Sequence, residues 1–475
     1  MAGIKFGTDG WRAVISDDFT FDNVRIVAQA IAGFINSRRE PVYKKKKVVV
    51  GYDTRFLSDR YAEVAARVLA ANGIKVVLSD RPCPTPSVSF YIKKKKLSGG
   101  VMITASHNPA EYNGVKYKGY YGGSAGNDII DAIEERLYKK TVRSMPVEKA
   151  VKEGKIARKD LITPQMEFIK KYADMKKLKK ARLRVLVDSM NGTGGTYLGG
   201  LLRTTGITVD YMNIEVNPGF KGRAPEPNEK HLQELMARVK KGGYDIGVAT
   251  DGDADRVGIV DGRGRMLSGH KVMALLLLHL LVNRKMRGAV VQTICGTRLI
   301  NKICEEYGLE VYETSVGFKY ICELMSKKPI LIGGEETGGV GFRNYIPERD
   351  GLLSALLILE MMATMKKPLK DILEWVDKKY GSYVYEREDV IFPASRRKQL
   401  MKGIKKQPLR KILARDVVEI NDADGTKFIC EDGSWLLLRL SGTEPKFRIY
   451  SETSSKKRSL EYIKFGREHA FSLIA

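Results

Sequence analysis

The 475-residue sequence contains few cysteines, and none of them are closely paired. The five are Cys83, Cys295, Cys304, Cys322 and Cys430. They are odd in number and widely scattered, with no C-x-x-C pair among them. This pattern argues against a disulfide scaffold and against a zinc site, and it fits a reducing, cytoplasmic environment.

Long hydrophobic runs and targeting signals are also missing. The longest nearly apolar run, residues 272–282, is interrupted by His279 and falls far short of the ~20 residues that span a bilayer. We interpret it as a buried helix. The opening residues 1–7 show no apolar core followed by a cleavage site, so we expect no secretory signal. We therefore expect a cytoplasmic protein without a membrane partner.

Negative charge is scarce relative to positive charge. The sequence has 82 lysines and arginines against 56 aspartates and glutamates, a formal net charge of +26. Clustered basic residues are typical of nucleic-acid binding, which is the non-enzyme alternative. However, the lysines are dispersed, and no helix-turn-helix or aromatic-interleaved basic module stands out. We interpret the runs at residues 44–47 and 93–96 as solvated surface, which would also attract small anionic substrates.

Two nucleotide-binding motifs are absent. The sequence has no G-x-x-x-x-G-K-[ST] phosphate loop, which argues against a kinase or ATPase of that class. Residues 191–197 (NGTGGTY) follow a predicted strand, but Tyr197 occupies the third glycine position of G-x-G-x-x-G. The dinucleotide-binding motif therefore fails.

What the sequence does contain is a repeated alternation of β-branched runs with helical patterns, which is typical of α/β architecture. We predict strands at residues 47–52, 74–78, 100–104, 182–188, 207–211, 244–249, 289–293, 310–313 and 329–332. Near residue 379 the pattern changes to strands at 383–391, 435–440 and 447–451 with a closing helix. A charged stretch at 139–159 is predicted to connect two domains. The expected fold is three similar α/β domains with mixed sheets and a smaller C-terminal α+β domain, bounded at 1–145, 155–258, 259–375 and 380–475.

The serine loop, residues 104–109 (TASHNP), follows a predicted apolar strand. Reactive groups of α/β proteins gather at such strand ends. The Ser106 hydroxyl could act as a nucleophile or carry a phosphoryl group, with His107 beside it and Lys116 ten residues later. The alternative is a simple turn at Asn108-Pro109 that Ser106 caps.

The aspartate loop, residues 251–256 (DGDADR), also follows a predicted strand. Its alternating carboxylates are hard oxygen ligands for Mg²⁺ or Ca²⁺, and without a cation they would repel one another strongly. An EF-hand is excluded, because Arg256 and Gly262 stand where that motif needs glycine and glutamate. We predict magnesium beside phosphate; the alternative is a solvated acidic turn.

The glutamate loop, residues 333–339 (GGEETGG), could hydrogen-bond sugar hydroxyls through Glu335 and Thr337. Glycine-rich turns are common, however, so an ordinary turn is the alternative. The arginine loop, residues 439–448, offers Arg439, Ser441, Thr443 and Arg448 as a phosphate cradle. Its alternative is a surface hairpin with incidental charges.

In this order the four loops resemble those of the α-D-phosphohexomutase family, which includes phosphoglucomutase, phosphomannomutase and phosphoglucosamine mutase. Residues 6–12 (FGTDGWR) are similar to the N-terminal signature of that family. The resemblance runs from about residue 5 to the last helix, and the serine and aspartate loops are its most diagnostic parts. It implies four domains around a central cleft, which contribute a phosphoserine loop, a metal-binding loop, a sugar-binding loop and a phosphate-binding loop.

The resemblance also implies residue roles. Ser106 would carry the phosphoryl group, Lys116 would be the general acid/base, and Arg256 would steady the transferring phosphate. Arg12 and His107 would support them. The implied magnesium ligands are Asp251, Asp253, Asp255 and a phosphoryl oxygen on Ser106. The implied substrate contacts are Lys319, Glu335, Thr337, Arg439, Ser441, Thr443 and Arg448.

The implied reaction is reversible phosphoryl transfer between C1 and C6 of a hexose phosphate, through phospho-Ser106 and a bisphosphorylated sugar. Its cofactors would be Mg²⁺ and glucose 1,6-bisphosphate or the matching sugar bisphosphate. A phosphoserine and three aspartates exceed the charge of one Mg²⁺ by roughly three units, so the site needs cations such as Arg12, Lys116 and Arg256. A desolvated lysine among cations would have a lowered pKa, which suits Lys116 to deprotonate a sugar hydroxyl.

The acidic pair Glu335-Glu336 favours glucose as the sugar. Phosphomannomutase or dual glucose and mannose activity stays open, followed by glucosamine and pentose phosphates. Thr337 and Gly339 depart from the serine and the histidine or aromatic residue common in relatives. A metal-dependent phosphatase is a further alternative. We expect a small phosphosugar partner, a monomer or homodimer, and one cleft faced by Ser106, Lys116, Asp251, Asp253, Asp255, Glu335 and Arg439.

Overall fold

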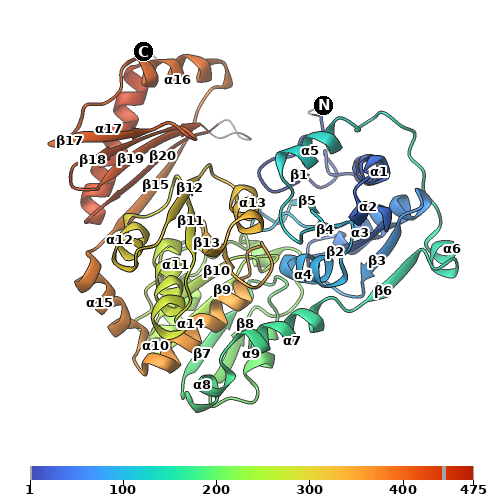
Figure 1. Cartoon of the computed structure of the whole chain (residues 1–475), viewed down its shortest axis with the longest axis horizontal. Coiled ribbons are helices and arrows are strands. Elements are labelled where there is room, and N and C mark those ends of the chain that lie inside the picture. The colour runs from blue at the N-terminus through green and yellow to red at the C-terminus, as the bar shows by residue number, and fades with distance from the viewer. Residues whose placement is uncertain (1–2, 441–445, 474–475) are drawn as a thin grey trace. The chain divides into compact units, whose positions relative to one another are not determined.

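The chain divides into two units in this computed structural model, which describes residues 3–440 and 446–473 (Figure 1). Unit 1 comprises Met1–Gly288 and Gly317–Lys370, and unit 2 comprises Ala289–Val316 and Asp371–Ala475. Strands and helices alternate along most of the chain, and a run of antiparallel strands follows near its end. The predicted architecture of α/β domains with a C-terminal sheet domain is confirmed.

The first sheet of unit 1 has the strand order β1-β5-β4-β2-β3-β6. Its elements are β1 (Trp11–Val14), α1 (Phe21–Ser37), α2 (Pro41–Lys44), β2 (Lys47–Tyr52), α3 (Ser58–Ala71), β3 (Lys75–Ser79), α4 (Thr85–Lys95), β4 (Gly99–Ile103), β5 (Tyr112–Lys118), α5 (Asn127–Glu134), α6 (Val147–Lys152) and β6 (Ile156–Lys159). Strands β4, β2, β3 and β6 are parallel, whereas β5 is antiparallel to both of its neighbours, β4 and β1. Val48 and Val50 of β2 join the core formed with α1 and α3, and Val49 joins the core formed with α4. Helices therefore cover both faces, because alternate strand side chains point to opposite sides.

The second sheet has the order β10-β9-β7-β8. Its elements are α7 (Ile162–Tyr172), α8 (Met175–Lys180), β7 (Arg184–Asp188), α9 (Tyr197–Leu202), β8 (Thr208–Met212), η1 (Phe220–Gly222), α10 (Gln233–Gly242), β9 (Ile246–Thr250) and β10 (Val257–Asp261). Strand β7 is parallel to β8 and β9, while β10 is antiparallel to β9. The aspartate loop is the connection between β9 and β10, so both of its ends are fixed by one strand pair.

The remaining elements of unit 1 hold the glutamate loop. They are α11 (Gly269–Leu278), η2 (His279–Asn283), α13 (Phe318–Lys327), β13 (Ile330–Gly334), β14 (Val340–Phe342) and α14 (Gly351–Met365). Strands β13 and β14 are antiparallel, with Ile332 opposite Phe342. The glutamate loop is the short turn that joins them.

Unit 2 contains a parallel strand pair and a six-stranded antiparallel sheet of order β15-β20-β19-β18-β17-β16. Its elements are β11 (Ala289–Thr293), α12 (Arg298–Tyr307), β12 (Val311–Thr314), α15 (Leu369–Tyr380, from residue 371), β15 (Val384–Ile391), η3 (Ala394–Arg396), α16 (Arg397–Lys406), β16 (Lys411–Ile412), β17 (Arg415–Asn421), β18 (Thr426–Cys430), β19 (Trp435–Leu440), β20 (Lys446–Thr453) and α17 (Lys456–Ser472). Leu436 and Ile449 of adjacent strands pack with Tyr462 of α17 in one core. This packing closes one face of the sheet with the final helix.

The predicted strands all overlap observed strands, with ends within two residues. Residues 139–159, which were predicted to connect two domains, also contain a helix and a strand, α6 and β6. Strand β6 pairs in parallel with β3 and so belongs to the first sheet. The segment is mostly polar, but Ala150 and Ile156 are buried in the core of that sheet and hold it in place. The exact bounds of the four predicted domains stay a prediction.

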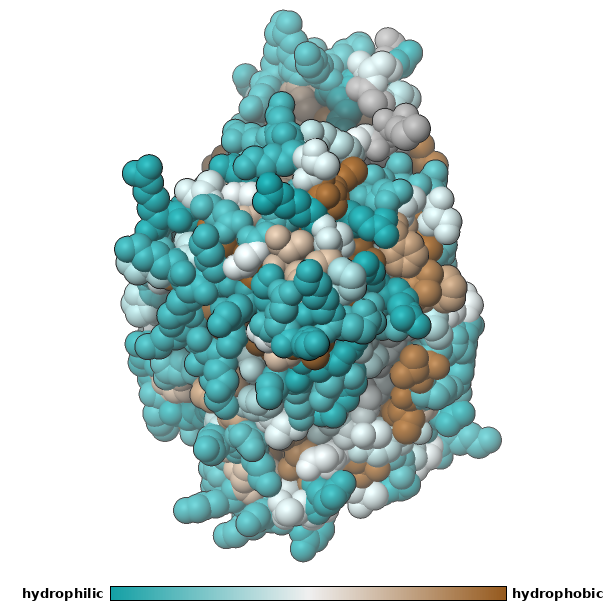
Figure 2. Space-filling view, turned by 90° about the vertical axis from the view of Figure 1, so that its right-hand side faces the viewer, coloured by the Kyte–Doolittle hydropathy of each residue, from teal (hydrophilic) through white to brown (hydrophobic). Residues whose placement is uncertain are grey.

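The surface matches the interpretation of the lysine runs. Lys44–47 and Lys93–96 are exposed, and hydrophilic side chains predominate on the face drawn in Figure 2. Residues 272–282 are mostly buried within α11 and η2, as predicted. Among the described residues, no helix combines the length and apolar character needed to cross a membrane. All five cysteines are buried, and none of them forms a disulfide bond in the part of the chain that the structure describes.

A buried ion cluster around Glu360 of α14 ties together three segments of unit 1. Arg284 donates from Nε to Glu360 Oε1 (2.7 Å) and from Nη2 to Oε2 (2.8 Å). His279 Nε2 lies 3.0 Å from Oε1, and the backbone N–H of Asp174 donates to Oε2 (2.8 Å). Burial alone would raise the pKa of Glu360, but the hydrogen bonds from His279 and Arg284 outweigh it and lower the pKa to about 2.

We expect Glu360→Gln to lower the free energy of unfolding by about 3 kcal/mol above pH 5, since a pKa unit is worth about 1.4 kcal/mol. A depressed carboxyl pKa stabilises the fold above the unfolded value near 4.5, and this stabilisation is lost as pH falls towards 2. The difference in the free energy of unfolding between wild type and variant, measured with urea, should therefore narrow by about 1 kcal/mol from pH 6.5 to pH 3.5. Glu323→Gln, at the exposed pair with Lys327, is the control, with an expected change below about 0.5 kcal/mol. A gap that stays constant with pH would contradict this account.

Candidate active site

The serine loop holds Ser106 in an unusual backbone conformation. Its φ is +52°, in the left-handed region that costs a non-glycine residue roughly 1–2 kcal/mol. The N–H of Ser106 donates to Thr104 Oγ1 (2.8 Å), and Arg55 Nη2 donates to the Ser106 carbonyl (2.7 Å). Arg55 also donates to the carbonyl of Pro109 (2.7 Å). These bonds hold the strained loop and fix the direction of the serine hydroxyl.

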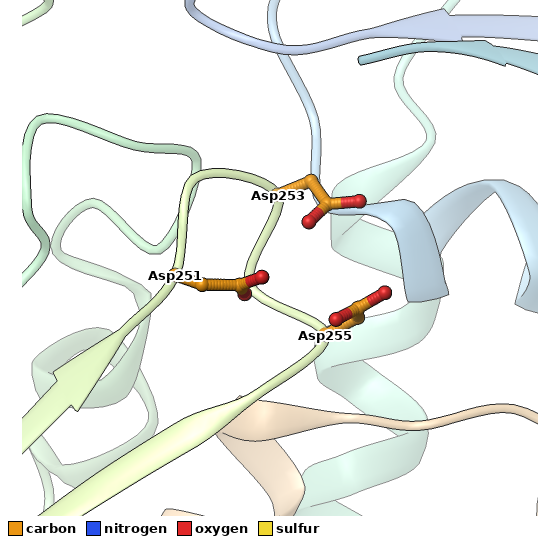
Figure 3. A group of neighbouring side chains, drawn as sticks. All are labelled: Asp251, Asp253 and Asp255. Carbon is orange, nitrogen blue, oxygen red and sulfur yellow. The ribbon is translucent and has the colours of Figure 1, made fainter. Parts of the chain in front are cut away.

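The aspartate loop gathers three buried carboxylates beside that hydroxyl. The side chains of Asp251, Asp253 and Asp255 turn towards one another (Figure 3), and one oxygen of each lies within 4.8 Å of the others. Ala254 between them has a left-handed φ of +55°, which reverses the chain. Ser106 Oγ donates to Asp251 Oδ2 (2.9 Å). The predicted reactive serine and the predicted metal ligands therefore form one cluster.

The two loops approach so closely that Gly252 is required between them. A Cβ at this position would overlap with the carbonyl oxygen of Ser106. Behind it, the N–H of Thr193 donates to the Gly252 carbonyl (3.0 Å), and a Cβ at Gly192 would lie 2.7 Å from the same oxygen. The glycine-rich turn that fails as a dinucleotide motif thus supports the aspartate loop.

The carboxylate cluster fits a hard divalent cation. Asp253 Oδ1 and Asp255 Oδ1 are buried without a hydrogen-bond partner among the described residues. Burial and the neighbouring carboxylates of Asp255 and Asp253 raise the pKa of Asp251 well above its usual value. Unpaired buried carboxylate oxygens at this spacing are suitable ligands for Mg²⁺, which prefers oxygen.

Lys116 of β5 supplies the nearest positive charge. Its Nζ lies 2.8 Å from Asp253 Oδ2, 3.2 Å from Asp255 Oδ2 and 2.9 Å from Asp9 Oδ2. The expected lowered pKa was wrong. Burial does oppose the charged form, but these three carboxylates outweigh it and raise the pKa of Lys116. The ammonium faces carboxylates at close range, not mainly cations.

Arg12 and His107 lie beside Ser106. Arg12 Nη1 donates to Asn108 Oδ1 (2.7 Å), which attaches it to the serine loop. His107 Nδ1 lies 3.5 Å from Ser106 Oγ. Burial, followed by the charges of Arg256 and Arg12, lowers the pKa of His107 well below its usual value. His107 is therefore neutral near pH 7.

Arg256 closes the aspartate loop at the start of β10. Its backbone N–H donates to Asp251 Oδ1 (3.1 Å), and its Nε lies 3.9 Å from Asp255 Oδ1. The mostly buried side chain thus lies against the carboxylate cluster, and its contact with the transferring phosphate stays a prediction.

The glutamate loop reaches the same cluster through a residue that sequence reasoning missed. Glu335 is 7% exposed, and its Oε2 accepts a hydrogen bond from Arg349 Nη1 (2.8 Å). Thr337 Oγ1 is buried without a hydrogen-bond partner in the part of the chain that the structure describes. Lys319 donates to Asn127 Oδ1 (2.6 Å). That bond directs Lys319 to the first residue of α5.

The arginine loop belongs to unit 2 and is described by itself. Arg439 and Arg448 stand opposite each other on β19 and β20. Their Nε atoms lie 2.9 Å from Asp424 Oδ1 and 3.7 Å from Asp389 Oδ2, respectively. Two arginines at directly opposed positions repel each other, and these two carboxylates offset part of that repulsion. The role of the arginines in binding phosphate stays a prediction. Two predicted residues lie outside the described residues: Ser441 and Thr443.

Models of one protein family match most of the sequence. Models of phosphoglucomutase/phosphomannomutase alpha/beta/alpha domains I, II and III match residues 3–143, 165–264 and 268–380, and the model of the C-terminal domain matches residues 395–465. The chain belongs to the phosphohexomutase family. Members are isomerases that transfer a phosphoryl group within a hexose phosphate.

Several relatives of this phosphohexomutase match over nearly their whole length. A phosphoglucomutase/phosphomannomutase of Thermococcus kodakarensis is 32% identical over 469 residues, 98% of each chain. A protein named probable phosphoglucosamine mutase, of Methanosphaera stadtmanae, is 32% identical over 474 residues, covering 99% of this chain and 98% of its own. A crystal structure from Thermus thermophilus, provisionally named a phosphomannomutase, is 34% identical with a TM-score of 0.85, covering 98% of this chain and 99% of its own. None of these findings supports the nucleic-acid alternative.

In this phosphohexomutase, sequence reasoning missed polar residues that contact the predicted site residues. Asp9 contacts Lys116, and it lies in the opening motif whose resemblance had been noted without a role. Thr85 donates its hydroxyl to Asp253 Oδ2. Arg349 gave no signal, because it lies in a short charged turn before α14. The placing of Arg439 relative to the residues of unit 1 stays a prediction.

Proposed function

We propose that this phosphohexomutase interconverts glucose 1-phosphate and glucose 6-phosphate through phospho-Ser106 and glucose 1,6-bisphosphate. The observation that carries the proposal is the 2.9 Å hydrogen bond from Ser106 Oγ to Asp251, inside a buried cluster that also holds Asp253, Asp255 and Lys116. A nucleophilic hydroxyl, candidate metal ligands and a cation at one point suit phosphoryl transfer, which depends on positioning and charge stabilisation.

The site residues would have distinct roles in this reaction. Asp251, Asp253 and Asp255 would hold Mg²⁺, which when bound neutralises and orients the phosphoryl oxygens. Arg256 adds positive charge beside the transferring group. Lys116 keeps a proton on Nζ at neutral pH, which suits donation to the sugar oxygen as its bond to phosphorus breaks. As Ser106 Oγ forms its bond to phosphorus, its hydroxyl proton would pass to Asp251, which accepts its hydrogen bond.

Burial of the reacting groups supports a mutase over a phosphatase. Ser106, Asp251 and Lys116 are at most 1% exposed. The same burial would keep water from a phosphorylated Ser106, whose hydrolysis would consume the phosphate that the cycle has to return. The five buried cysteines, none of which forms a disulfide bond among the described residues, are in line with a cytoplasmic setting.

The choice of sugar rests on the glutamate loop. Glu335 and Glu336 can accept hydrogen bonds from sugar hydroxyls, and we rank glucose first on this ground. Mannose or dual specificity ranks second, because the Thermococcus kodakarensis relative carries both names. Glucosamine ranks third, supported by the relative from Methanosphaera stadtmanae.

The test is ³¹P NMR of the protein with Mg²⁺, a trace of the matching sugar bisphosphate, and glucose, mannose or glucosamine 1-phosphate in separate tubes. We expect the 1-phosphate signal to convert to 6-phosphate fastest with glucose, without release of inorganic phosphate. A tube with excess EDTA is the control and should stay unchanged. Growth of inorganic phosphate would favour the phosphatase, and fastest conversion of another sugar would replace glucose.

A further inference from the structure

One arginine joins three carboxylates from distant parts of unit 1. Arg349 Nη1 donates to Glu335 Oε2 (2.8 Å), and Nη2 donates to Asp255 Oδ2 and Asp9 Oδ2 (2.7 Å each). The two ends of one planar guanidinium therefore contact the glutamate loop on one side and the aspartate loop on the other. Arg349 is only 2% exposed, so these ion pairs are shielded from water.

The backbone around Arg349 is anchored to both loops as well. The N–H of Asp350 donates to the Val340 carbonyl (3.1 Å), just after the glutamate loop. The N–H of Gly351 donates to the Ala254 carbonyl (3.1 Å), within the aspartate loop. Arg349 thus starts from a fixed point relative to each loop that its side chain contacts.

The side chain of Arg349 has little freedom to move. Its guanidinium carbon lies 5.2 Å from the centre of the Phe318 ring, a cation–π contact. A Cβ at Gly339 would overlap with Arg349 Cδ, so the glutamate loop runs directly against the arginine stem. The absent side chain at position 339 makes room for this arginine.

The charges explain why a cation is needed here. Asp9, Asp255 and Glu335 approach one another in a buried region, and Lys116 reaches only the first two. Burial raises the pKa of Glu335, and the charge of Arg349 opposes this rise. Without Arg349, Glu335 would be a buried carboxylate without its ion-pair partner, which is strongly unfavourable.

We propose that Arg349 is a positioning residue that fixes the glutamate loop against the aspartate loop. The position of Glu335, the proposed sugar contact, is thereby fixed relative to the loop that carries the metal ligands. Arg349 acts through Glu335 and Asp255 and does not touch the reacting atoms. The proposal rests on the proposed role of Glu335 as a sugar contact. A lysine cannot replace this arginine, because an ammonium is a point charge and cannot bridge both loops as a planar fork does.

The experiment compares Arg349→Lys, Glu335→Gln and the double variant, with whichever hexose 1-phosphate the wild type converts. We expect each single variant to raise KM roughly tenfold with kcat changed less than about threefold, since a hydrogen bond to a charged group is lost. The double variant should raise KM no more than about twofold above either single, because both changes remove one interaction. Arg284→Lys is the matched control: it changes another buried arginine–glutamate pair in the same unit and should leave KM unchanged.

Amide hydrogen exchange provides a readout that does not depend on activity. In Arg349→Lys without substrate, peptides covering residues 333–339 should exchange at least about fivefold faster, whereas Arg284→Lys should not change them. Faster exchange in a protein that converts no sugar phosphate would leave the positioning role standing and overturn the proposed function. Unchanged exchange, or KM effects that multiply to about a hundredfold in the double variant, would overturn the role of Arg349.

Discussion

Replacing Ser106 by alanine or by glycine is expected to lower kcat about a thousandfold or more, because the group that carries the phosphoryl is removed. The two variants separate chemistry from stability. Alanine keeps the left-handed strain at φ +52°, whereas glycine adopts this conformation without steric cost. Both should be equally inactive in a coupled assay of glucose 6-phosphate formation, although Ser106→Gly should be at least as stable as Ser106→Ala.

Mass spectrometry of the same proteins gives an independent check. Wild type incubated with glucose 1,6-bisphosphate should carry one phosphate on the peptide that contains Ser106, and neither variant should carry it there. Ser79→Ala is the control, since Ser79 is also buried in the first sheet and donates to the Arg81 carbonyl (2.7 Å). Substantial activity in Ser106→Ala would show that another group carries the phosphoryl.

Gly252→Ala is expected to lower kcat about a hundredfold, the effect of misplacing reacting groups by about 1 Å. The added Cβ overlaps with the Ser106 carbonyl oxygen, which is backbone and cannot rotate away. The serine and aspartate loops must therefore separate, which lengthens the contact from Ser106 Oγ to Asp251. The same variant should bind Mg²⁺ more weakly, measured by the concentration that gives half-maximal activity.

The matched control is Gly200→Ala, the same substitution at an exposed position in α9. No heavy atom lies within 4 Å of the added Cβ there. This variant should keep full activity and gain up to about 1 kcal/mol, since alanine is the better helix former. If Gly252→Ala kept wild-type kcat, close approach of the two loops would not be needed for catalysis.

The parallel strands of the fold could be predicted because they are buried on both faces and read as β-branched runs. Strands β2 and β11 were predicted with their observed ends for this reason. Strand β5 was missed, because two of its inward positions are Lys116 and Lys118, which are buried. Their partners are far away in sequence: Lys118 Nζ lies 2.6 Å from Glu348 Oε2, 230 positions on. Patterns of hydrophobicity cannot show a strand whose core contacts are ion pairs.

The residues of the candidate site also differ in whether they could be predicted from the sequence. Ser106 and the three aspartates could be found because each loop directly follows an apolar strand. Residues of these types at such a place seldom have a purely structural role. Arg349 could not be found, since Glu348-Arg349-Asp350 looks like an ordinary charged turn before a helix. The role of Arg349 depends on its contact with Asp9, 340 positions away, and on the space left by Gly339. The raised pKa of Lys116 was missed because its ammonium was expected mainly among cations, whereas Asp253, Asp255 and Asp9 lie in direct contact with it.

The order of synthesis bears on how this site is assembled. Unit 1 is interrupted by residues 289–316, and the contact between Asp9 and Arg349 spans 340 positions. At about 5–20 residues per second, a ribosome would need roughly 20–70 s to deliver the arginine after the aspartate. During that time the N-terminal sheet can form with Asp9 paired to Lys116 and Lys118, while Glu348 and Arg349, which also contact Lys118 and Asp9, have not yet been made. The ion pairs that Arg349 makes with Asp9, Asp255 and Glu335 are thus completed late in biosynthesis. An N-terminal fragment ending before residue 349 would lack them.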